Sequence, residues 1–165
     1  MPRAPAAAAR ASPSEGPFDA LIVRPATSAD RPAWAKMRHL LWPDEEPEEL
    51  ESDLDAYDSS DELAGFVAEA EDGRLIGFAE VAMRSYVEGP CAPGPYLEGI
   101  WVDTKYRRRG IGRALLGAAE QWGRERGFDH LGSDALIDNE VSHAWHRAAG
   151  FAEIERVVIF GKSMK

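Results

Sequence analysis

The strongest constraint on the fold is a continuous stretch in which a strand-like run, a basic turn and a long amphipathic helix follow one another. Residues 96–102 have the apolar character of a strand, and residues 105–109 form the basic turn. Apolar side chains then recur at helical spacing over residues 110–126, and Gly127 supplies a glycine C-cap. A weaker strand pattern at residues 130–136 completes a strand-helix-strand unit, which predicts a right-handed parallel crossover.

The flanking sequence adds antiparallel strands and further helices to this unit. The Asp72-Gly73 pair joins two strand-like runs and is a strong hairpin signal. The predicted architecture is therefore α/β, with a mixed central β-sheet flanked by helices and the element order β-α-α-β-β-β-α-β-α-β. The predicted strands are residues 20–23, 66–69, 75–83, 96–102, 130–136 and 151–160; the predicted helices are one capped by residues 27–30 and reaching Leu41, one from Pro47 to Tyr57, one at 110–126 and one at 139–149.

Length and composition describe one ordinary domain. With 165 residues, 44% hydrophobic and 29% charged, the chain can form a hydrophobic core, and it has no apolar run near the roughly 20 residues of a membrane span. Cys91 is the only cysteine, so no internal disulfide can form, and no Cys/His cluster has zinc-ligand spacing. We expect a cytoplasmic protein without a metal. Residues 1–19 are rich in Ala, Pro and Ser and are interpreted as a disordered tail or leader, which leaves residues 20–165 as the domain.

The negative charge of the chain is concentrated in one segment. Residues 44–62 contain eleven carboxylates and no Lys or Arg, against a net charge of −10 for the whole chain. Such a run is either a solvated helix with its flanks or an electrostatic funnel for a multiply charged cation, and the two interpretations are compatible. The overall charge argues against a nucleic-acid backbone as partner.

The six residues Arg107-Arg108-Arg109-Gly110-Ile111-Gly112 stand between the predicted strand and the predicted helix. At such a place backbone N–H groups lack intrahelical partners, and the helix dipole attracts anions. The two glycines allow close approach of the backbone, and the arginines add positive charge. The motif therefore predicts a pyrophosphate site, although a basic helix start without a ligand has the same local sequence.

In this context the chain resembles the GNAT acetyltransferases, whose acetyl-CoA signature is an Arg/Gln-x-x-Gly-x-Gly/Ala turn between the fourth strand and the third helix. The resemblance covers roughly residues 21–162 in element order. It implies the GNAT fold, acetyl-CoA as co-substrate and an N-acetyltransferase activity. It also implies that Ile100, Trp101 and Val102 contact the acetyl and pantetheine part, that Asn139 binds the pantetheine arm, and that the pyrophosphate is held by Arg107, Arg108, Arg109, Gly110, Ile111, Gly112 and Arg113.

A narrower set of segments is similar to the aminoglycoside 6′-N-acetyltransferases of type I. These segments are Leu41-Trp42-Pro43, Tyr86-Val87-Glu88-Gly89, Leu97-Glu98-Gly99-Ile100, Ser133-Asp134, Asn139 and Glu155-Arg156-Val157. The similarity implies a resistance enzyme that acetylates the 6′-amine of aminoglycoside antibiotics, a polycationic substrate surrounded by Trp42, Tyr86, Glu98, Asp134 and Glu155. Without the resemblance, Trp42 fits a core position, Tyr86 a loop aromatic over the core, and Glu155 a surface strand position.

Two of these acids have a case of their own. Glu98 and Asp134 are predicted to lie at the carboxyl ends of neighbouring central strands, where open α/β sheets bind ligands. A primary ammonium with a pKa near 10.4 is free base in only about one molecule in a few thousand at pH 7, so a proton must leave before the amine attacks. We expect Glu98 to provide the route for that proton, directly or through water, and Asp134 to position the amine.

The residue expected to donate a proton to the leaving CoA thiolate differs from the family pattern. Many GNAT enzymes use a tyrosine on the fourth helix, whereas this chain has His143 and His146 there, and His146 matches the position best. A lone helical histidine also fits a structural role. The resemblance further implies that a backbone N–H near Trp101 meets the reacting carbonyl oxygen, with no covalent enzyme intermediate, so Cys91 is not expected to be a nucleophile.

Two other functions are compatible with the sequence. One is a GNAT enzyme that acetylates a polyamine, a small metabolite or a protein amine, because the acidic segment suits any polycation. The other is a non-catalytic acyl-CoA-binding module, although such a module has no evident need for Glu98 and Asp134. Family analogy also implies a homodimer formed through the C-terminal part.

Overall fold

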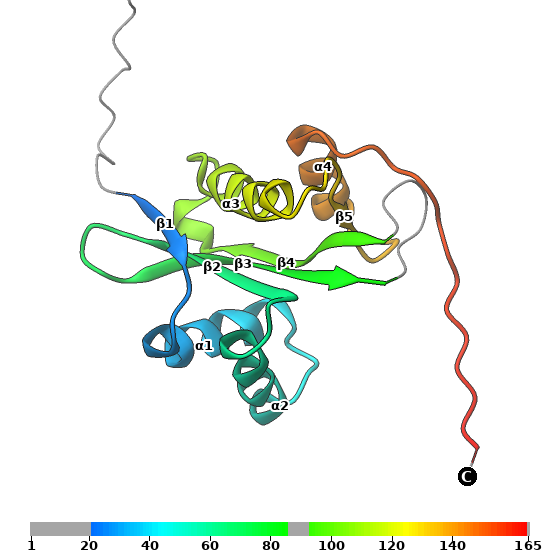
Figure 1. Cartoon of the computed structure of the whole chain (residues 1–165), viewed down its shortest axis with the longest axis horizontal. Helices are drawn as coiled ribbons and strands as arrows, with labels where there is room; N and C mark the ends of the chain where they lie inside the picture. Colours follow the sequence, from blue (N-terminus) through cyan, green and yellow to red (C-terminus); the bar gives the residue numbers. More distant parts are fainter. Residues whose placement is uncertain (1–20, 86–92, 165) are drawn as a thin grey trace, which may run out of the picture.

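Five strands form one mixed sheet in the computed structural model, which describes residues 21–85 and 93–164 (Figure 1). The strands are β1 (Ile22–Pro25), β2 (Leu63–Glu69), β3 (Leu75–Arg84), β4 (Gly94–Val102) and β5 (Gly132–Ser133), and they lie side by side in that order. Neighbouring strands from β1 to β4 are antiparallel, whereas β5 runs parallel to β4. The parallel pair confirms the predicted crossover, and the predicted hairpin joins β2 to β3 with Gly73 at a φ of 79°.

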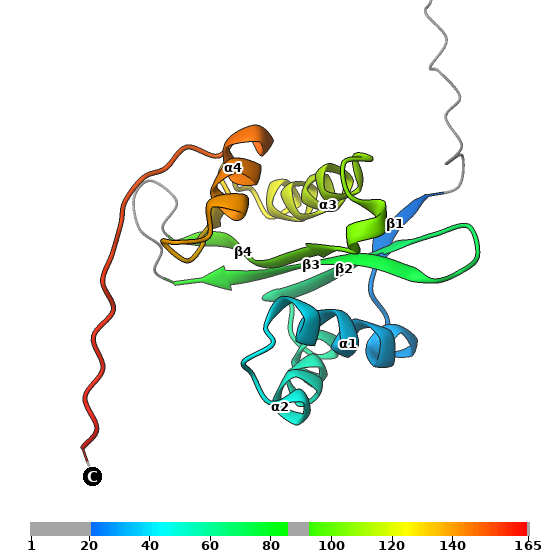
Figure 2. The ribbon, with the colours of Figure 1, turned by 180° about the vertical axis from the view of Figure 1, so that it is seen from behind.

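Helices cover both faces of the sheet and build a hydrophobic core on each (Figures 1 and 2). One face carries α1 (Arg31–Leu41) and α2 (Pro47–Ser52), and the other carries α3 (Ile111–Glu125) and α4 (Glu140–Ala149). Leu115 lies in the core under α3 and Phe78 in the core under α1, and neither is exposed to solvent. No helix within the described ranges is long and apolar enough to cross a membrane.

The second predicted helix is shorter than expected. Regular α-helix ends at Ser52 and continues as a 3₁₀ segment, η2 (Asp53–Asp58). Asp and Ser are poor helix formers because their side chains compete for backbone hydrogen bonds, and four of them stand between positions 52 and 58. The apolar stripe is nevertheless kept: Leu54 is buried, and Tyr57 packs edge-on against Trp34 with ring centres 5.1 Å apart.

The last predicted strand, residues 151–160, is wrong for the single chain. These residues have no regular secondary structure and run as an extended segment away from the body of the domain (Figure 1). Val158, Ile159 and Phe160 are 77%, 91% and 90% exposed. A strand-like sequence becomes a strand only beside another strand that accepts and donates its backbone hydrogen bonds. The neighbouring element β5 is itself only two residues long, shorter than the predicted 130–136.

Asp30 connects the first strand to the first helix. Its carboxylate accepts two hydrogen bonds from Arg24, at 2.7 and 2.9 Å, and two from Thr27, at 2.8 Å from the backbone N–H and 2.9 Å from the hydroxyl. Thr27 and Asp30 form the capping box of the short turn η1 (Ser28–Asp30) that leads into α1, which confirms the predicted cap. The hydrogen bonds from Arg24, helped by those from Thr27, lower the pKa of Asp30 to about 2.

Replacing Asp30 with Asn should lower the free energy of unfolding by about 1–2 kcal/mol at pH 7, a figure discounted because the Arg24 side chain is 32% exposed and solvent screens the pair. A carboxyl group whose pKa is lowered by folding stabilises the protein above its unfolded pKa, and it loses that contribution as the pH falls through about 2. The difference between wild type and Asp30→Asn, measured by urea unfolding, should therefore shrink between about pH 5 and pH 2. A difference that stays constant over this range would contradict the role of the carboxylate.

Candidate functional site

One extra residue in β4 shapes the centre of the candidate site. Leu97 and Gly99 pair with consecutive residues of β3, so the ladder skips Glu98. β4 also pairs with β5 only at Tyr96 and Leu97, and from Glu98 onward this edge of β4 is not paired with β5. A bulge of this kind kinks a strand and re-aims a side chain. Glu98 thus lies in the middle of β4, not at its carboxyl end as predicted, and at the point where β4 stops pairing with the edge strand β5.

Glu98 and Asp134, the two acids expected to act on the amine, belong to one connected group of side chains. Arg84 of β3 donates from Nε to one oxygen of Glu98 at 2.8 Å and from Nη2 to the other at 2.5 Å. The guanidinium carbon of Arg84 lies 3.6 Å from the centre of the Tyr96 ring. The Tyr96 hydroxyl in turn donates to Asp134 at 2.7 Å. The structure thus brings the two predicted acids together through Arg84 and Tyr96, which the sequence did not single out.

This group of charges faces solvent. The side chain of Arg84 is 41% exposed and that of Glu98 is 25% exposed, and Asp134 is also exposed. Burial, together with the hydrogen bond to Asp134, raises the pKa of Tyr96, so the phenol remains a hydrogen-bond donor at neutral pH. The hydrogen bonds to Glu98 raise the pKa of Arg84 further above its ordinary value. A cationic ligand can therefore reach both acids from solvent.

Trp42 follows α1 and lies against β4 beside the bulge. A Cβ atom built on Gly99 would come within 2.6 Å of Cη2 of Trp42, so only glycine allows this packing. The indole is half-buried, with its ring centre 6.2 Å from that of Phe78 and 5.3 Å from the guanidinium carbon of Arg38. Trp42 therefore belongs partly to the core, as its position in the sequence suggested, and partly to the surface beside Glu98.

A buried charge lies under this part of the sheet. Glu80 of β3 is 1% exposed; it accepts hydrogen bonds from Trp34 at 2.7 Å and Tyr57 at 3.1 Å and forms an ion pair with Arg38 at 3.0 Å. Burial raises the pKa of Glu80, and the charge of Arg38 opposes that shift. The cluster ties α1 and η2 to β3 behind Trp42. The signal in the sequence is a lone acid in the otherwise apolar run of β3, a position that requires a partner.

The basic turn before α3 has the backbone geometry of an anion site. Arg108 has a φ of 62° and Gly110, the N-cap of α3, has a φ of 83°, so two residues of the turn are left-handed. Glycine adopts this conformation without strain, whereas at Arg108 it is strained, and such strain is concentrated at functional sites. Left-handed residues in a turn direct neighbouring N–H groups into one concavity, here next to the positive end of the α3 dipole. These residues fit a pyrophosphate.

Contacts around this turn dock α3 onto β4 and α4. Arg107 donates from Nε to the carbonyl of Val102 at 2.9 Å, and Arg113 donates to a carbonyl in the last turn of α4 at 2.9 Å. A Cβ atom on Gly112 would lie 3.4 Å from the indole nitrogen of Trp145, so α4 packs closely on the start of α3 at this position. The turn is thereby held next to the β4 residues that follow the bulge, Ile100, Trp101 and Val102.

His146 is held by hydrogen bonds on both sides of its ring. Nδ1 lies 2.8 Å from the backbone carbonyl of Ser142, which only accepts, so in the neutral ring Nδ1 carries the proton. Nε2 lies 3.0 Å from the hydroxyl of Ser133 on β5, whose single proton can go to this nitrogen or to the carbonyl of Leu97 at 3.2 Å. Asn139 is the N-cap of α4, and its side-chain oxygen accepts from the N–H of Ser142 at 3.0 Å. The histidine therefore connects α4 to the residue that precedes Asp134.

Two predicted substrate residues are not brought to this place. Tyr86 lies outside the described residues, as does Cys91. Glu155 is exposed and belongs to the extended C-terminal segment that leaves the domain (Figure 1). The structure therefore does not show Glu155 as part of the group around Glu98.

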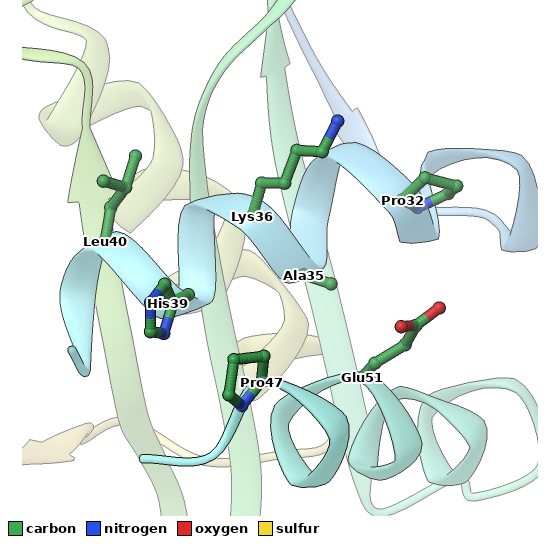
Figure 3. Close-up of a pocket in the computed structure, with 7 residues that line it drawn as sticks. All are labelled: Pro32, Ala35, Lys36, His39, Leu40, Pro47 and Glu51. Carbon is green, nitrogen blue, oxygen red and sulfur yellow. The ribbon is translucent and has the colours of Figure 1, made fainter. Parts of the chain in front are cut away.

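A hollow of about 510 Å³ lies between α1 and α2, apart from this site (Figure 3). None of the predicted site residues lines it. Its lining residues are Pro32, Ala35, Lys36, His39, Leu40, Pro47 and Glu51. Within residues 21–85 and 93–164, no cluster of His, Cys, Asp and Glu is suited to holding a metal ion.

Most of the chain is similar in sequence to one family of known proteins. The model of the acetyltransferase (GNAT) family matches residues 34–151. An aminoglycoside N(6′)-acetyltransferase type 1 of Stenotrophomonas maltophilia is 46% identical over 142 residues, which span 84% of this chain and 90% of that protein. The protein of the same name from Klebsiella aerogenes is 39% identical over 148 residues, which span 87% of this chain and 97% of that protein.

Solved structures share the fold. AAC(6′)-Iy in complex with the bisubstrate analogue CoA-S-monomethyl-acetylneamine has a TM-score of 0.82 and 33% identity, and the match covers 88% of this chain and 99% of that one. AAC(6′)-Ih of Acinetobacter baumannii also has a TM-score of 0.82 and 33% identity, over 88% of this chain and 100% of that one. The likeness extends over nearly the full length of these structures.

Replacing Gly99 with Ala should disturb Trp42 directly, because the new methyl group would overlap the indole at 2.6 Å. We expect the free energy of unfolding, measured in urea, to fall by about 1–3 kcal/mol. Gly117→Ala is the matched control, because nothing lies within 4 Å of the Cβ position at Gly117 and alanine favours its helix. Equal stability of the two variants would contradict the close packing of Trp42 on β4.

Proposed function

The chain belongs to the acetyltransferase (GNAT) family, and we propose that it transfers the acetyl group of acetyl-CoA to the 6′-amine of aminoglycoside antibiotics. The observation that carries this proposal is the likeness to aminoglycoside N(6′)-acetyltransferases over most of the chain. Glu98 and Asp134, the acids at the β4 bulge, are suited to binding a positively charged amine. A relative solved with an analogue that unites CoA and an acetylated neamine supports the same pair of substrates.

The acids at the bulge suit an amine acceptor. A primary ammonium must lose a proton before its nitrogen attacks a thioester, because only the free amine has a lone pair. Glu98 provides the route for this proton, directly or through a water molecule. Asp134, which accepts the hydrogen bond of Tyr96, binds and positions the amine. Because both acids meet solvent, the proton can pass on to bulk water.

Acetyl-CoA supplies the acetyl group as a thioester that an amine attacks directly. The turn before α3 holds the pyrophosphate through its backbone N–H groups and the charges of its arginines. The edge of β4 beyond Leu97 offers backbone groups of Ile100, Trp101 and Val102 to the pantetheine and the acetyl carbonyl. The side-chain oxygen of Asn139 caps α4, so a contact with the pantetheine arm uses its amide nitrogen.

His146 and Ser133 form the proposed proton-donating pair for the leaving thiolate. The neutral ring carries its proton on Nδ1, which is engaged with the carbonyl of Ser142, and therefore has none to donate from Nε2. In the protonated ring Nε2 donates to Ser133 across the same 3.0 Å contact, and the serine proton then goes to the Leu97 carbonyl at 3.2 Å or onward to the thiolate. The proton is thus held at the end of β5, one residue before Asp134.

The acidic segment supports a substrate with several positive charges. All eleven carboxylates of residues 44–62 are exposed. Arg31 pairs with Asp55 at 2.5 Å and with Asp58 at 2.6 Å and neutralises part of this charge. The rest of the segment gives the α1 side of the domain a negative field, which raises the encounter rate with cations at low salt. The solvated helix and the electrostatic funnel are thus one and the same segment.

We also propose a homodimer and a cytoplasmic location. Two features support pairing of the C-terminal segment with a second copy: the exposed apolar side chains of residues 154–160 and the very short edge strand β5. In such a dimer the second copy would cover these side chains and supply neighbours for Glu155. The single cysteine, which excludes an internal disulfide, supports the cytoplasm.

Incubation of the full chain with acetyl-CoA and kanamycin should release CoA and give a product acetylated on the 6′ nitrogen, as located by NMR. Glu98→Gln should lower kcat/KM by about 10²–10⁴-fold and flatten its dependence on pH, because the amide cannot accept the proton. Glu120→Gln is the control, because Glu120 is an acid on α3 that pairs with Arg124 at 3.4 Å outside the site.

Three outcomes would correct this proposal at different levels. A product acetylated on another nitrogen, or turnover of spermine without turnover of kanamycin, would assign a different amine acceptor within the family. Binding of acetyl-CoA without turnover of any amine would favour the non-catalytic module. An unchanged kcat and pH profile in Glu98→Gln would exclude Glu98 as the proton route.

Replacing Val158 with Asp should convert the dimer to a monomer in sedimentation equilibrium, because a charged side chain opposes burial between two copies. Ile137→Asp is the matched control, because Ile137 is also an exposed apolar residue, at 64%, but lies before α4 rather than in the C-terminal segment. A wild-type chain that sediments as a monomer, or a Val158→Asp variant that stays dimeric, would contradict the proposed interface.

A further inference from the structure

Glu98 is already engaged before any substrate arrives. Arg84 donates to both of its carboxylate oxygens, from Nε at 2.8 Å and from Nη2 at 2.5 Å. This two-point contact is the strongest that a guanidinium makes with a carboxylate. An ammonium that binds Glu98 in the same place would lie against the guanidinium, and two like charges at contact distance repel each other. Glu98 and Arg84 therefore cannot keep this arrangement while Glu98 serves an amine.

The charges around Glu98 are unbalanced in favour of a cation. Glu98 and Asp134 carry two negative charges, and Arg84 is the cation that lies next to both, through the direct pair and across the Tyr96 ring. Asp134 also contributes to the raised pKa of Arg84, so the guanidinium senses both acids. The place occupied by Arg84 is thus a cation site between the two acids proposed to handle the amine.

The pair can be exchanged at low cost. The Arg84 side chain is 41% exposed and that of Glu98 is 25% exposed, and ion pairs that face solvent contribute little net stability. Arg84 is the last residue of β3, so its side chain can swing into solvent without disturbing the sheet. A contrasting pair of the same chemistry, Arg38 with Glu80, is buried and cannot exchange in this way.

We propose that Arg84 sets an affinity threshold for the acceptor: it occupies on Glu98 the place of the acceptor's ammonium group, so every acceptor must displace it and only those with several positive charges still bind tightly. This inference rests on the proposed amine acetylation and adds to it the reason for a polycationic substrate. Arg84 is tethered to the site, so it competes with the acceptor at a high effective concentration. A monoamine replaces one cation by one cation and gains little. A polyamine adds contacts with Asp134 and with the acidic segment, and these contacts offset the loss of the Arg84 pair.

The test compares the binding of two amines, n-butylamine with one charge and spermidine with three, to the full chain. Binding is followed by the chemical shift of the Gly99 backbone N–H, which lies next to the bulge. In Arg84→Gln we expect the dissociation constants of n-butylamine and of spermidine to fall by a similar factor, about threefold to tenfold, because both amines must displace the same guanidinium. Arg84→Lys keeps a tethered charge and should leave both dissociation constants near their wild-type values. Arg124→Gln, on the outer face of α3, is the control and should change neither constant.

Weaker or unchanged binding of n-butylamine in Arg84→Gln would overturn the proposal, because Arg84 would then merely hold Glu98 in place. Should this variant fail to fold, a measurement on the wild-type chain still tests whether the acceptor displaces Arg84. The Nε–H resonance of Arg84 should shift when spermidine saturates the site, and a resonance that does not move would overturn the displacement. Neither amine has to be acetylated in this binding experiment. A negative result would therefore leave the proposed acetylation untouched, and a lack of kanamycin turnover would not affect the interpretation of the binding data.

Discussion

The extra residue at Glu98 determines the placement of every other part of the site. In a regular strand, residues three apart point to opposite faces of the sheet. Leu97 and Ile100 are three apart, yet both pack into the core under α3, because the bulge between them restores the alternation. Glu98 is thereby released from the core pattern and can carry a charge at the centre of the sheet. The same interruption coincides with the end of the pairing between β4 and β5, which leaves β4 backbone groups for a ligand.

A second requirement is that the helical layer under the bulge stays in place. The ring of Trp42 rests on Gly99 with no room for a side chain, so a small movement of α1 would change the wall beside Glu98. The buried contacts of Glu80 with Trp34 and Arg38 join α1 to β3 a short distance away. Burying this charge is costly, and removing one partner of such a pair costs more than the pair contributes. The position of α1 is therefore defined by a few polar contacts rather than by apolar packing alone.

A feature of this structure could be predicted from the sequence when the residues that form it are neighbours in the chain. The turn at residues 107–112 was predicted because strand, glycines and helix follow one another in the chain, and the left-handed Gly110 agrees with that pattern. The strand at 151–160 was predicted wrongly because strand formation depends on a neighbour that the local sequence does not describe. Arg84 was missed for a similar reason: it reaches Glu98 only across the paired strands β3 and β4. The tie between Glu98 and Asp134 likewise depends on Tyr96, a residue whose sequence context indicates only a buried aromatic.

Two Arg–Glu ion pairs of the domain differ in burial, and this difference explains why one is fixed and the other can open. Arg38 and Glu80 are 8% and 1% exposed, and their ion pair holds a helix to the sheet. Arg84 and Glu98 are 41% and 25% exposed, so water and salt compensate each charge when the pair opens. The first pair can only be a fixed part of the scaffold, since an open state would leave a charge in the core. The second can open at little cost. A site for a charged acceptor needs both kinds of pair, one that keeps the wall of the site still and one that gives up its carboxylate when a stronger cation arrives.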